Sequence, residues 1–138
     1  MTHLAPSDEA VRALRSRGIE GPVVMLNLLR FRKTADYTRF PDLEPGEAIS
    51  GRDAYGRYGD HVAPLLAAAG GEVILSGTAA HFLIGPEGER WDAALLVRYP
   101  SLDAFFAFIG DPAYLAGVGH RMAALADSRL LPIVPATI

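Results

Sequence analysis

Three polar residues of this 138-residue chain have side chains suited to proton transfer or to polarising a carbonyl group: Asn27, Arg98 and His120. A histidine with an ordinary pKa of ~6.5 exchanges protons near neutral pH. An arginine presents a planar fork of donors to a carboxylate or enolate, and an amide orients a carbonyl or hydroxyl. Together the three could catalyse proton transfer next to a carbonyl, or oxygenation of an electron-rich substrate, so we take them as the catalytic candidates.

Each of these residues also has a structural interpretation. Asn27 lies within an apolar run, where an unpartnered amide would cost about 1–3 kcal/mol, so it could be a satisfied core amide. Arg98 could pair with a local carboxylate, Asp92 or Asp103, because buried charges need partners. His120 could be a histidine on a helix surface, or a base that Asp127 orients. The sequence leaves both interpretations open.

Four further residues could line a substrate pocket: Tyr55, Tyr58, His81 and Trp91. The two tyrosines are three residues apart in a predicted helix, a spacing that is also typical of core packing. Trp91 opens a predicted strand, where it could form a pocket wall or seal the end of a sheet. His81 lies in another predicted strand and is a second acid–base candidate.

Signatures of metals and cofactors are absent from the sequence. No two histidines have the i, i+4 spacing of a helical metal site, no glycine-rich phosphate loop follows a strand, and no Gly-x-Ser-x-Gly motif occurs. The lack of cysteine excludes disulfides, thiolate catalysis and iron–sulfur clusters. We therefore predict no metal and no organic cofactor. Haem is the alternative that the sequence leaves open, because its ligation needs only one histidine and follows no spacing rule.

Composition narrows the range of partners. A net charge of -3 argues against nucleic-acid binding, which needs a concentrated basic face. Charges interrupt the first twenty residues, and no apolar run approaches the ~20 residues that span a bilayer, so we expect a cytoplasmic protein without a membrane partner. Hydrophobic residues make up 50% of the chain and charged residues 21%, which predicts apolar surface that a partner covers or that lines a pocket.

The elements that must position these candidates follow the order β-α-β-β-α-β, the ferredoxin-like split unit of the α+β class, after an added N-terminal helix. We expect residues 1–21 to form this helical extension and residues 22–138 to form the domain. Strands are predicted over 22–32, 73–84, 91–99 and 130–134, and helices over 7–17, 53–69, 101–109 and 112–126. Ser7 can cap the first helix, and Gly77 can form a bulge or a point of close approach in the second strand. Gly117 and Gly119 weaken the last helix before it resumes at His120.

Helices cover only one face of the sheet in this topology, yet the first and third predicted strands are apolar on both faces. A second copy of the sheet would cover the other face, which predicts a homodimer with two sheets face to face. Residues 33–50 form an unusually long connection that is either mobile or a lid, with Tyr37 and Phe40 able to close a pocket.

With the elements placed, residues 22–132 resemble a bacterial family known as domain of unknown function 1330, in the dimeric α+β barrel superfamily. The resemblance implies the fold and dimer argued above, and a superfamily that includes cofactor-independent monooxygenases, lactone isomerases, haem enzymes and proteins without known activity. Two departures are Arg98, where the family commonly has an acidic residue, and Phe108, where shorter members often have tryptophan. The matching segments are 24–29, Tyr55 with Tyr58, Gly70-Gly71, Ile84-Gly85, Trp91-Asp92, Tyr99-Pro100-Ser101, 111–114, His120-Arg121 and 127–130.

The resulting hypothesis is a protein that binds a small, partly apolar organic molecule. It could be a cofactor-independent enzyme for proton transfer, isomerisation or monooxygenation. The alternative is a non-catalytic binding or interaction module of the same fold, in which the polar residues only hold the sheet and the dimer together.

Overall fold

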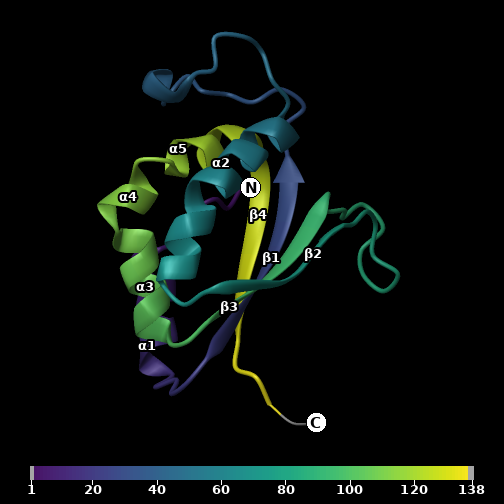
Figure 1. Ribbon diagram of the computed structural model, residues 1–138. Coiled ribbons are helices and arrows are strands. Elements are labelled where there is room, and N and C mark those ends of the chain that lie inside the picture. Colours follow the sequence, from purple (N-terminus) through teal and green to yellow (C-terminus); the bar gives the residue numbers. More distant parts are fainter. Residues whose placement is uncertain (1, 137–138) are drawn as a thin grey trace.

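Four antiparallel strands form the centre of the computed structural model, which describes residues 2–136. They lie in the order β2-β3-β1-β4, so that the first and third strands occupy the middle of the sheet as their apolar composition requires. This order and the helices on one face confirm the predicted ferredoxin-like fold (Figure 1). The strands are β1 (Val23–Phe31), β2 (Glu72–Thr78), β3 (Ala93–Tyr99) and β4 (Leu125–Ile133).

The main helices pack against one face of the sheet and leave the other face uncovered (Figure 1). They are α2 (Gly51–Ala68), α3 (Leu102–Gly110), α4 (Pro112–Leu115) and α5 (Val118–Ala124). Side chains cap the predicted starts of α2, α3 and α4, because Ser50, Ser101 and Asp111 each accept a hydrogen bond from a backbone N–H two or three residues on.

The N-terminal helix α1 (Asp8–Ser16) is capped by Ser7, as predicted, and lies beside α3 (Figure 1). Leu14 packs against the core, and the Arg15 guanidinium lies 4.0 Å from the centroid of the Phe106 ring. The extension is therefore held against the domain by an apolar contact and a cation–π contact.

Several element boundaries differ from the predictions, most of all at β4 and β2. β4 begins at Leu125 rather than at residue 130, because pairing with Phe31 of β1 already holds the backbone extended there, and α5 therefore ends before residue 126. β2 ends at Thr78, and its irregular register lies between Val73 and Leu75 rather than at Gly77. Residues 79–92, here called the arm, extend beyond the sheet between β2 and β3.

Strand alternation defines the two faces of the sheet. Val23, Met25 and Leu29 of β1 are buried beneath the helices, so Val24 and Leu28 between them point to the uncovered face, here called the open face. The connection between β1 and α2 carries a short 3-10 helix, η1 (Pro41–Leu43).

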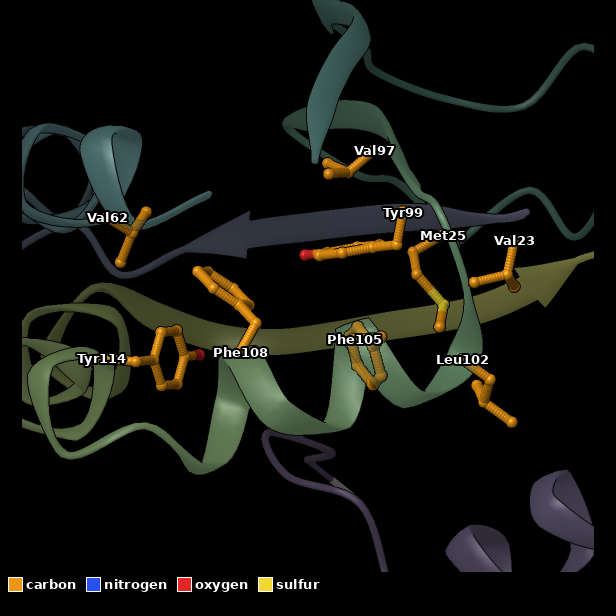
Figure 2. Packing of buried hydrophobic residues seen from close by; sticks show 9 residues of the cluster. All are labelled: Val23, Met25, Val62, Val97, Tyr99, Leu102, Phe105, Phe108 and Tyr114. Atoms are coloured by element: carbon orange, nitrogen blue, oxygen red, sulfur yellow. The ribbon is translucent and has the colours of Figure 1, made fainter. Parts of the chain in front are cut away.

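The core beneath the helices is divided into two apolar clusters. Partly buried Leu95 of β3 packs against both, which places the division at the middle of the sheet. The first cluster (Figure 2) contains Val23, Met25, Val62, Val97, Tyr99, Leu102, Phe105, Phe108 and Tyr114. The second contains Leu29, Tyr37, Ala54, Ala93, Ala123, Ala124 and Leu125.

Candidate functional site

Asn27 lies at the division between the two apolar clusters. It is on the helix side of β1, because Met25 and Leu29 two residues away are buried there, and it is paired with Leu95 of β3. Its Nδ2 donates to the Met25 carbonyl at 3.2 Å. Its Oδ1 has no hydrogen-bond partner among residues 2–136, so only part of the amide's capacity is used.

Four tyrosines, here called the tyrosine cluster, meet on the same side of the sheet: Tyr55 and Tyr58 of α2, Tyr99 of β3 and Tyr114 of α4. The hydroxyls of Tyr58 and Tyr114 share a hydrogen bond of 3.1 Å. The hydroxyls of Tyr55 and Tyr99 have no hydrogen-bond partner in the described chain, although Tyr99 is only 6% exposed. Figure 2 shows the Tyr99 and Tyr114 hydroxyls pointing inward toward Phe108.

The surroundings keep three of these hydroxyls, those of Tyr55, Tyr58 and Tyr99, protonated. Burial raises the pKa of Tyr55 to about 12 and raises the pKa values of Tyr58 and Tyr99 further, with neighbouring tyrosines adding to the effect. Arg121 acts in the opposite direction on the pKa of Tyr55 and Tyr58, so its guanidinium lies within electrostatic reach of the cluster. At neutral pH the site therefore offers neutral O–H donors beside a fixed positive charge.

Arg121 is itself held in place from α5. Its Nη1 donates to the Leu4 carbonyl at 2.5 Å and its Nη2 donates to the Ser128 hydroxyl at 3.4 Å. The guanidinium has five N–H donors, so these two contacts leave some of them free for an oxygen of a ligand. The sequence analysis did not identify Arg121, Tyr99 or Tyr114 as site residues. It named them only within the segments that match the family.

Arg98 does not join Asn27. The neighbours Val97 and Tyr99 are buried on the helix side, so Arg98 points to the open face, where it lies 3.9 Å from Glu72 of the adjacent strand. Asn27 and Arg98 therefore lie on opposite faces of the sheet, and the carboxylate near Arg98 is Glu72 rather than Asp92 or Asp103.

His120 lies in neither of these places, but beside the start of the long connection between β1 and α2. Its Nδ1 lies 2.7 Å from the Tyr37 hydroxyl, and the two rings meet edge to face. Burial lowers the pKa of His120, and the charges of Arg57 and His61 lower it further. Tyr37, rather than Asp127, is therefore the side chain that orients this histidine.

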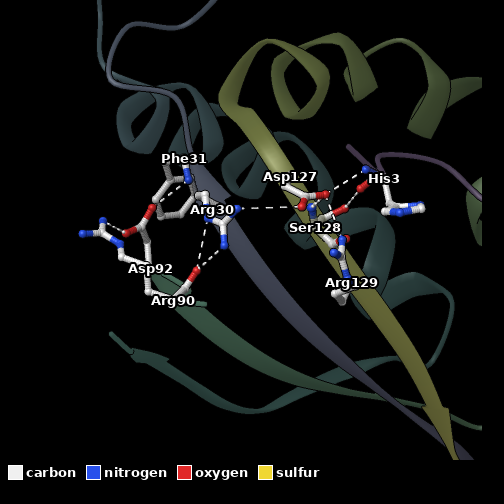
Figure 3. A network of polar contacts seen from close by, with 8 residues as sticks. All are labelled: His3, Arg30, Phe31, Arg90, Asp92, Asp127, Ser128 and Arg129. Atoms are coloured by element: carbon white, nitrogen blue, oxygen red, sulfur yellow. Dashed lines mark hydrogen bonds and ion pairs between the residues drawn. The ribbon is translucent and has the colours of Figure 1, made fainter. Parts of the chain in front are cut away.

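Asp127 belongs to a charged network on the open face (Figure 3). It accepts hydrogen bonds from the backbone N–H groups of His3 (2.7 Å) and Ser128 (2.9 Å) and from Arg129 (2.9 Å), and Arg30 lies 3.9 Å away. Burial opposes ionisation of Asp127, but these hydrogen bonds lower its pKa below the ordinary value.

Trp91 and His81 lie apart from the tyrosine cluster. Trp91 is 1% exposed between two cations, with the guanidinium carbons of Arg30 and Arg129 at 4.6 and 5.0 Å from its ring. Its Nε1 is buried without a partner in the described residues. His81 lies in the exposed arm, where it forms an isolated bridge with Arg90. Of the four predicted pocket residues, only Tyr55 and Tyr58 come together.

The long connection between β1 and α2 encloses a shallow hollow of about 430 Å³, lined by its own residues from Thr34 to Ile49. Three acidic side chains border it, Asp36, Glu44 and Glu47.

Within residues 2–136 no three histidine or acidic side chains are grouped so that they could hold a metal ion. No helix in that range has the length and apolar character needed to cross a membrane.

The chain is similar to several known proteins. A family model described as Domain of unknown function (DUF1330) matches residues 47–134. The crystal structure of RPA0582, a protein of unknown function from Rhodopseudomonas palustris, is 38% identical, covers 100% of both chains and gives a TM-score of 0.86. Methylated RPA0582 is 40% identical over 99% of this chain and 96% of that one, with a TM-score of 0.86.

A more distant structure shares the fold alone. An uncharacterized NIPSNAP domain protein from Burkholderia xenovorans is 14% identical and gives a TM-score of 0.50, covering 83% of this chain and 94% of that one. A search of curated proteins found no match.

Proposed function

The chain belongs to the DUF1330 family, and we propose that it binds a small organic molecule between its helices and its sheet, at Asn27, the tyrosine cluster and Arg121. The observation that carries this proposal is a set of polar atoms on the helix side of the sheet that no other protein group uses. Asn27 Oδ1 and the hydroxyls of Tyr55 and Tyr99 lack protein partners in the described chain. Polar atoms with free hydrogen-bonding capacity beside apolar clusters can orient a bound ligand.

The character of these groups indicates what the ligand would carry. The tyrosine hydroxyls are neutral donors and Arg121 is a cation, so together they favour an oxygen that holds negative charge, as in a carboxylate or an enolate. The Asn27 amide oxygen can accept a hydrogen bond from a hydroxyl of the same ligand. Apolar clusters flank the site on both sides, so the rest of the ligand would be apolar.

The same groups could support catalysis. Donors aimed at a developing enolate lower the barrier to removing a proton next to a carbonyl. His120 would serve as base only if the ligand or the long connection brought it nearer, since its contact is with Tyr37. Arg98 lies on the other face and takes no part in this proposal.

Binding is tested first with benzoate and cyclohexanecarboxylate as probes, by isothermal titration calorimetry. We expect either probe to bind the wild type, and Asn27→Ala and Tyr99→Phe to weaken binding at least tenfold. Tyr37→Phe is the matched control, because this tyrosine lies outside the cluster and should leave affinity unchanged. Equal affinity in all four proteins would overturn the site.

Catalysis is tested separately by NMR, as deuterium exchange at the carbon next to the carbonyl of a phenylketone. An enzyme of the proposed class would accelerate exchange above the buffer rate, and Tyr99→Phe would reduce that acceleration. Binding without acceleration would favour the non-catalytic module.

We also propose that the protein is a homodimer joined through its open faces. The uncovered face carries exposed apolar side chains, including Leu75 and Leu131. A compact 14.8-kDa monomer exposes about 7,000 Å². This chain exposes 8595 Å². The excess, about 1,600 Å², exceeds the roughly 800 Å² that each partner buries in a standard interface. Sedimentation equilibrium tests this state, and a monomer at all concentrations would contradict it.

A further inference from the structure

The arm, residues 79–92, is an ordered extension of the β2–β3 hairpin. Ala79 donates its backbone N–H to the Asp92 carbonyl at 3.0 Å, and Trp91 donates to the Ala80 carbonyl at 3.0 Å. His81 then bridges Arg90, and Glu89 donates to the Pro86 carbonyl in the turn. These contacts hold the arm in a fixed direction at the edge of the sheet, on the side away from the helices (Figure 1).

The tip of this arm is apolar and makes almost no contact with its own chain. Leu83 is 99% exposed and Ile84 is 92% exposed, and Phe82 beside them is also exposed. Scattered single apolar residues on a surface need no explanation, but three consecutive ones on a projecting arm mark a site that meets another surface. The tip therefore has the composition of an interface core without a partner in the monomer.

Charges at the base of the tip complement the open face. Glu87 and Glu89 follow the tip and form no ion pair in the described chain, whereas Arg90 is occupied by Asp92 at 2.8 Å. The open face carries Arg129, which pairs with Asp127 through Nη1 at 2.9 Å but keeps 42% of its side chain exposed. Its Nη2 makes no hydrogen bond in the described chain, so it can still meet a carboxylate. An acidic arm and this exposed arginine on one chain suit contact between two copies of that chain.

The sheet order then indicates where the arm of one copy would reach. β2 and β4 are the opposite edges of the sheet. A two-fold axis that runs along the strands, between two sheets face to face, places the β2 edge of one copy over the β4 edge of the other. The arm leaves β2 at Thr78, which the register places level with Ser128 through Ala93 and Leu29. It would therefore cross the partner copy's β4 near Arg129, two residues before Leu131, which is 57% exposed.

We propose that the arm is a clasp for a second copy of this chain, with Leu83 and Ile84 packed on β4 of the partner copy's open face near Leu131. The proposal depends on the homodimer proposed above and adds a specific contact to it. Each dimer has two such contacts, because the two-fold axis repeats the arm on both sides.

The test compares dimer dissociation constants by sedimentation equilibrium. The variant Leu83→Asp/Ile84→Asp should dissociate at least tenfold more readily than the wild type, because it places charges in an apolar contact. It should stay folded by circular dichroism, since neither side chain is buried. Leu115→Asp is the matched control: Leu115 is 53% exposed but lies on α4, on the helix side, and its dimer should match the wild type.

The outcomes separate the two proposals. A monomeric wild type would overturn the homodimer and the clasp together. A dimer weakened by Leu131→Asp but not by Leu83→Asp/Ile84→Asp would overturn the clasp alone.

Because the chain has no cysteine, Leu83→Cys/Leu131→Cys can be cross-linked with a short bismaleimide. We expect covalent dimers from this pair and none from either single variant, and absence of cross-linking would overturn the docking position.

Discussion

The Tyr58 hydroxyl lies 3.1 Å from the Tyr114 hydroxyl, whereas the Tyr99 hydroxyl in the same cluster has no hydrogen-bond partner within residues 2–136. The same chemical change should therefore have different effects at the two positions. We expect Tyr58→Phe to lower the free energy of unfolding by about 1 kcal/mol, because it leaves Tyr114 without its partner. Tyr99→Phe should leave it unchanged or raise it by about 0.5–1 kcal/mol.

Urea denaturation of the two variants and the wild type measures this difference. Equal losses for both would mean that Tyr99 makes a hydrogen bond that the geometry does not contain, and the argument for an unused donor would fail.

Alkaline pH should unfold the protein through its tyrosines. Burial raises the pKa of Tyr55 to about 12, while a tyrosine in the unfolded chain ionises near pH ~10. Between these values the folded state keeps a proton that the unfolded state has lost, so this contribution is complete below pH ~10 and disappears as pH rises toward 12.

We expect phenolate absorbance to rise together with loss of the circular dichroism signal, and Tyr55→Phe to reduce the steepness of that loss. Ionisation of Tyr55, Tyr58 and Tyr99 in a protein that keeps its native spectrum would contradict the prediction.

His120 should make a second, acidic contribution to the pH dependence. Burial lowers its pKa below the ordinary value of ~6.5, with Arg57 and His61 acting in the same direction. The unfolded chain therefore takes up this proton first, so the contribution of His120 is present above pH ~6.5 and is lost as pH falls through the folded-state pKa.

An NMR titration of the imidazole should give a midpoint below the ordinary value of ~6.5. His120→Asn should flatten the fall in stability between pH ~7 and ~5. A His120 midpoint at or above ~6.5 would contradict the assigned environment.

Two glycines of α2 should respond oppositely to alanine. A Cβ at Gly51 would collide with the backbone carbonyls of Arg32 and Ala124, neither of which is a flexible side chain. A Cβ at Gly56 would meet no atom within 4 Å. We expect Gly51→Ala to destabilise by about 2–3 kcal/mol through overpacking, and Gly56→Ala to stabilise by about 0.5–1 kcal/mol. Thermal and urea unfolding of both variants check the prediction.

The fold could be predicted from the sequence because local signals agree with the global arrangement. Capping residues such as Ser50 and Ser101 mark helix starts, and the two-sided apolar character of β1 and β3 places them in the centre of the sheet. Pro132 suits β4, an edge strand that pairs with β1 alone, since a proline cannot donate to a ladder on both sides.

The candidate site could be predicted only in part, and the same apolar character explains why. When both faces of a strand are apolar, the alternation of its side chains does not show which face the helices cover. The sequence therefore could not show that Asn27 and Arg98 lie on opposite faces of the sheet. The contact between Tyr37 and His120 joins positions 83 residues apart and depends on how the long connection folds. The position of Arg121 could not be predicted for a similar reason, because its contact with Ser128 of β4 depends on how α5 packs against the sheet.

Trp91 is the single tryptophan of the chain, and it lies at the base of the arm with a guanidinium near its ring from each of Arg30 and Arg129. Its fluorescence therefore comes from one known place, beside two guanidinium groups of the open face. The molecule thus contains a natural optical reporter of its open face, one that registers changes at the arm without any attached dye.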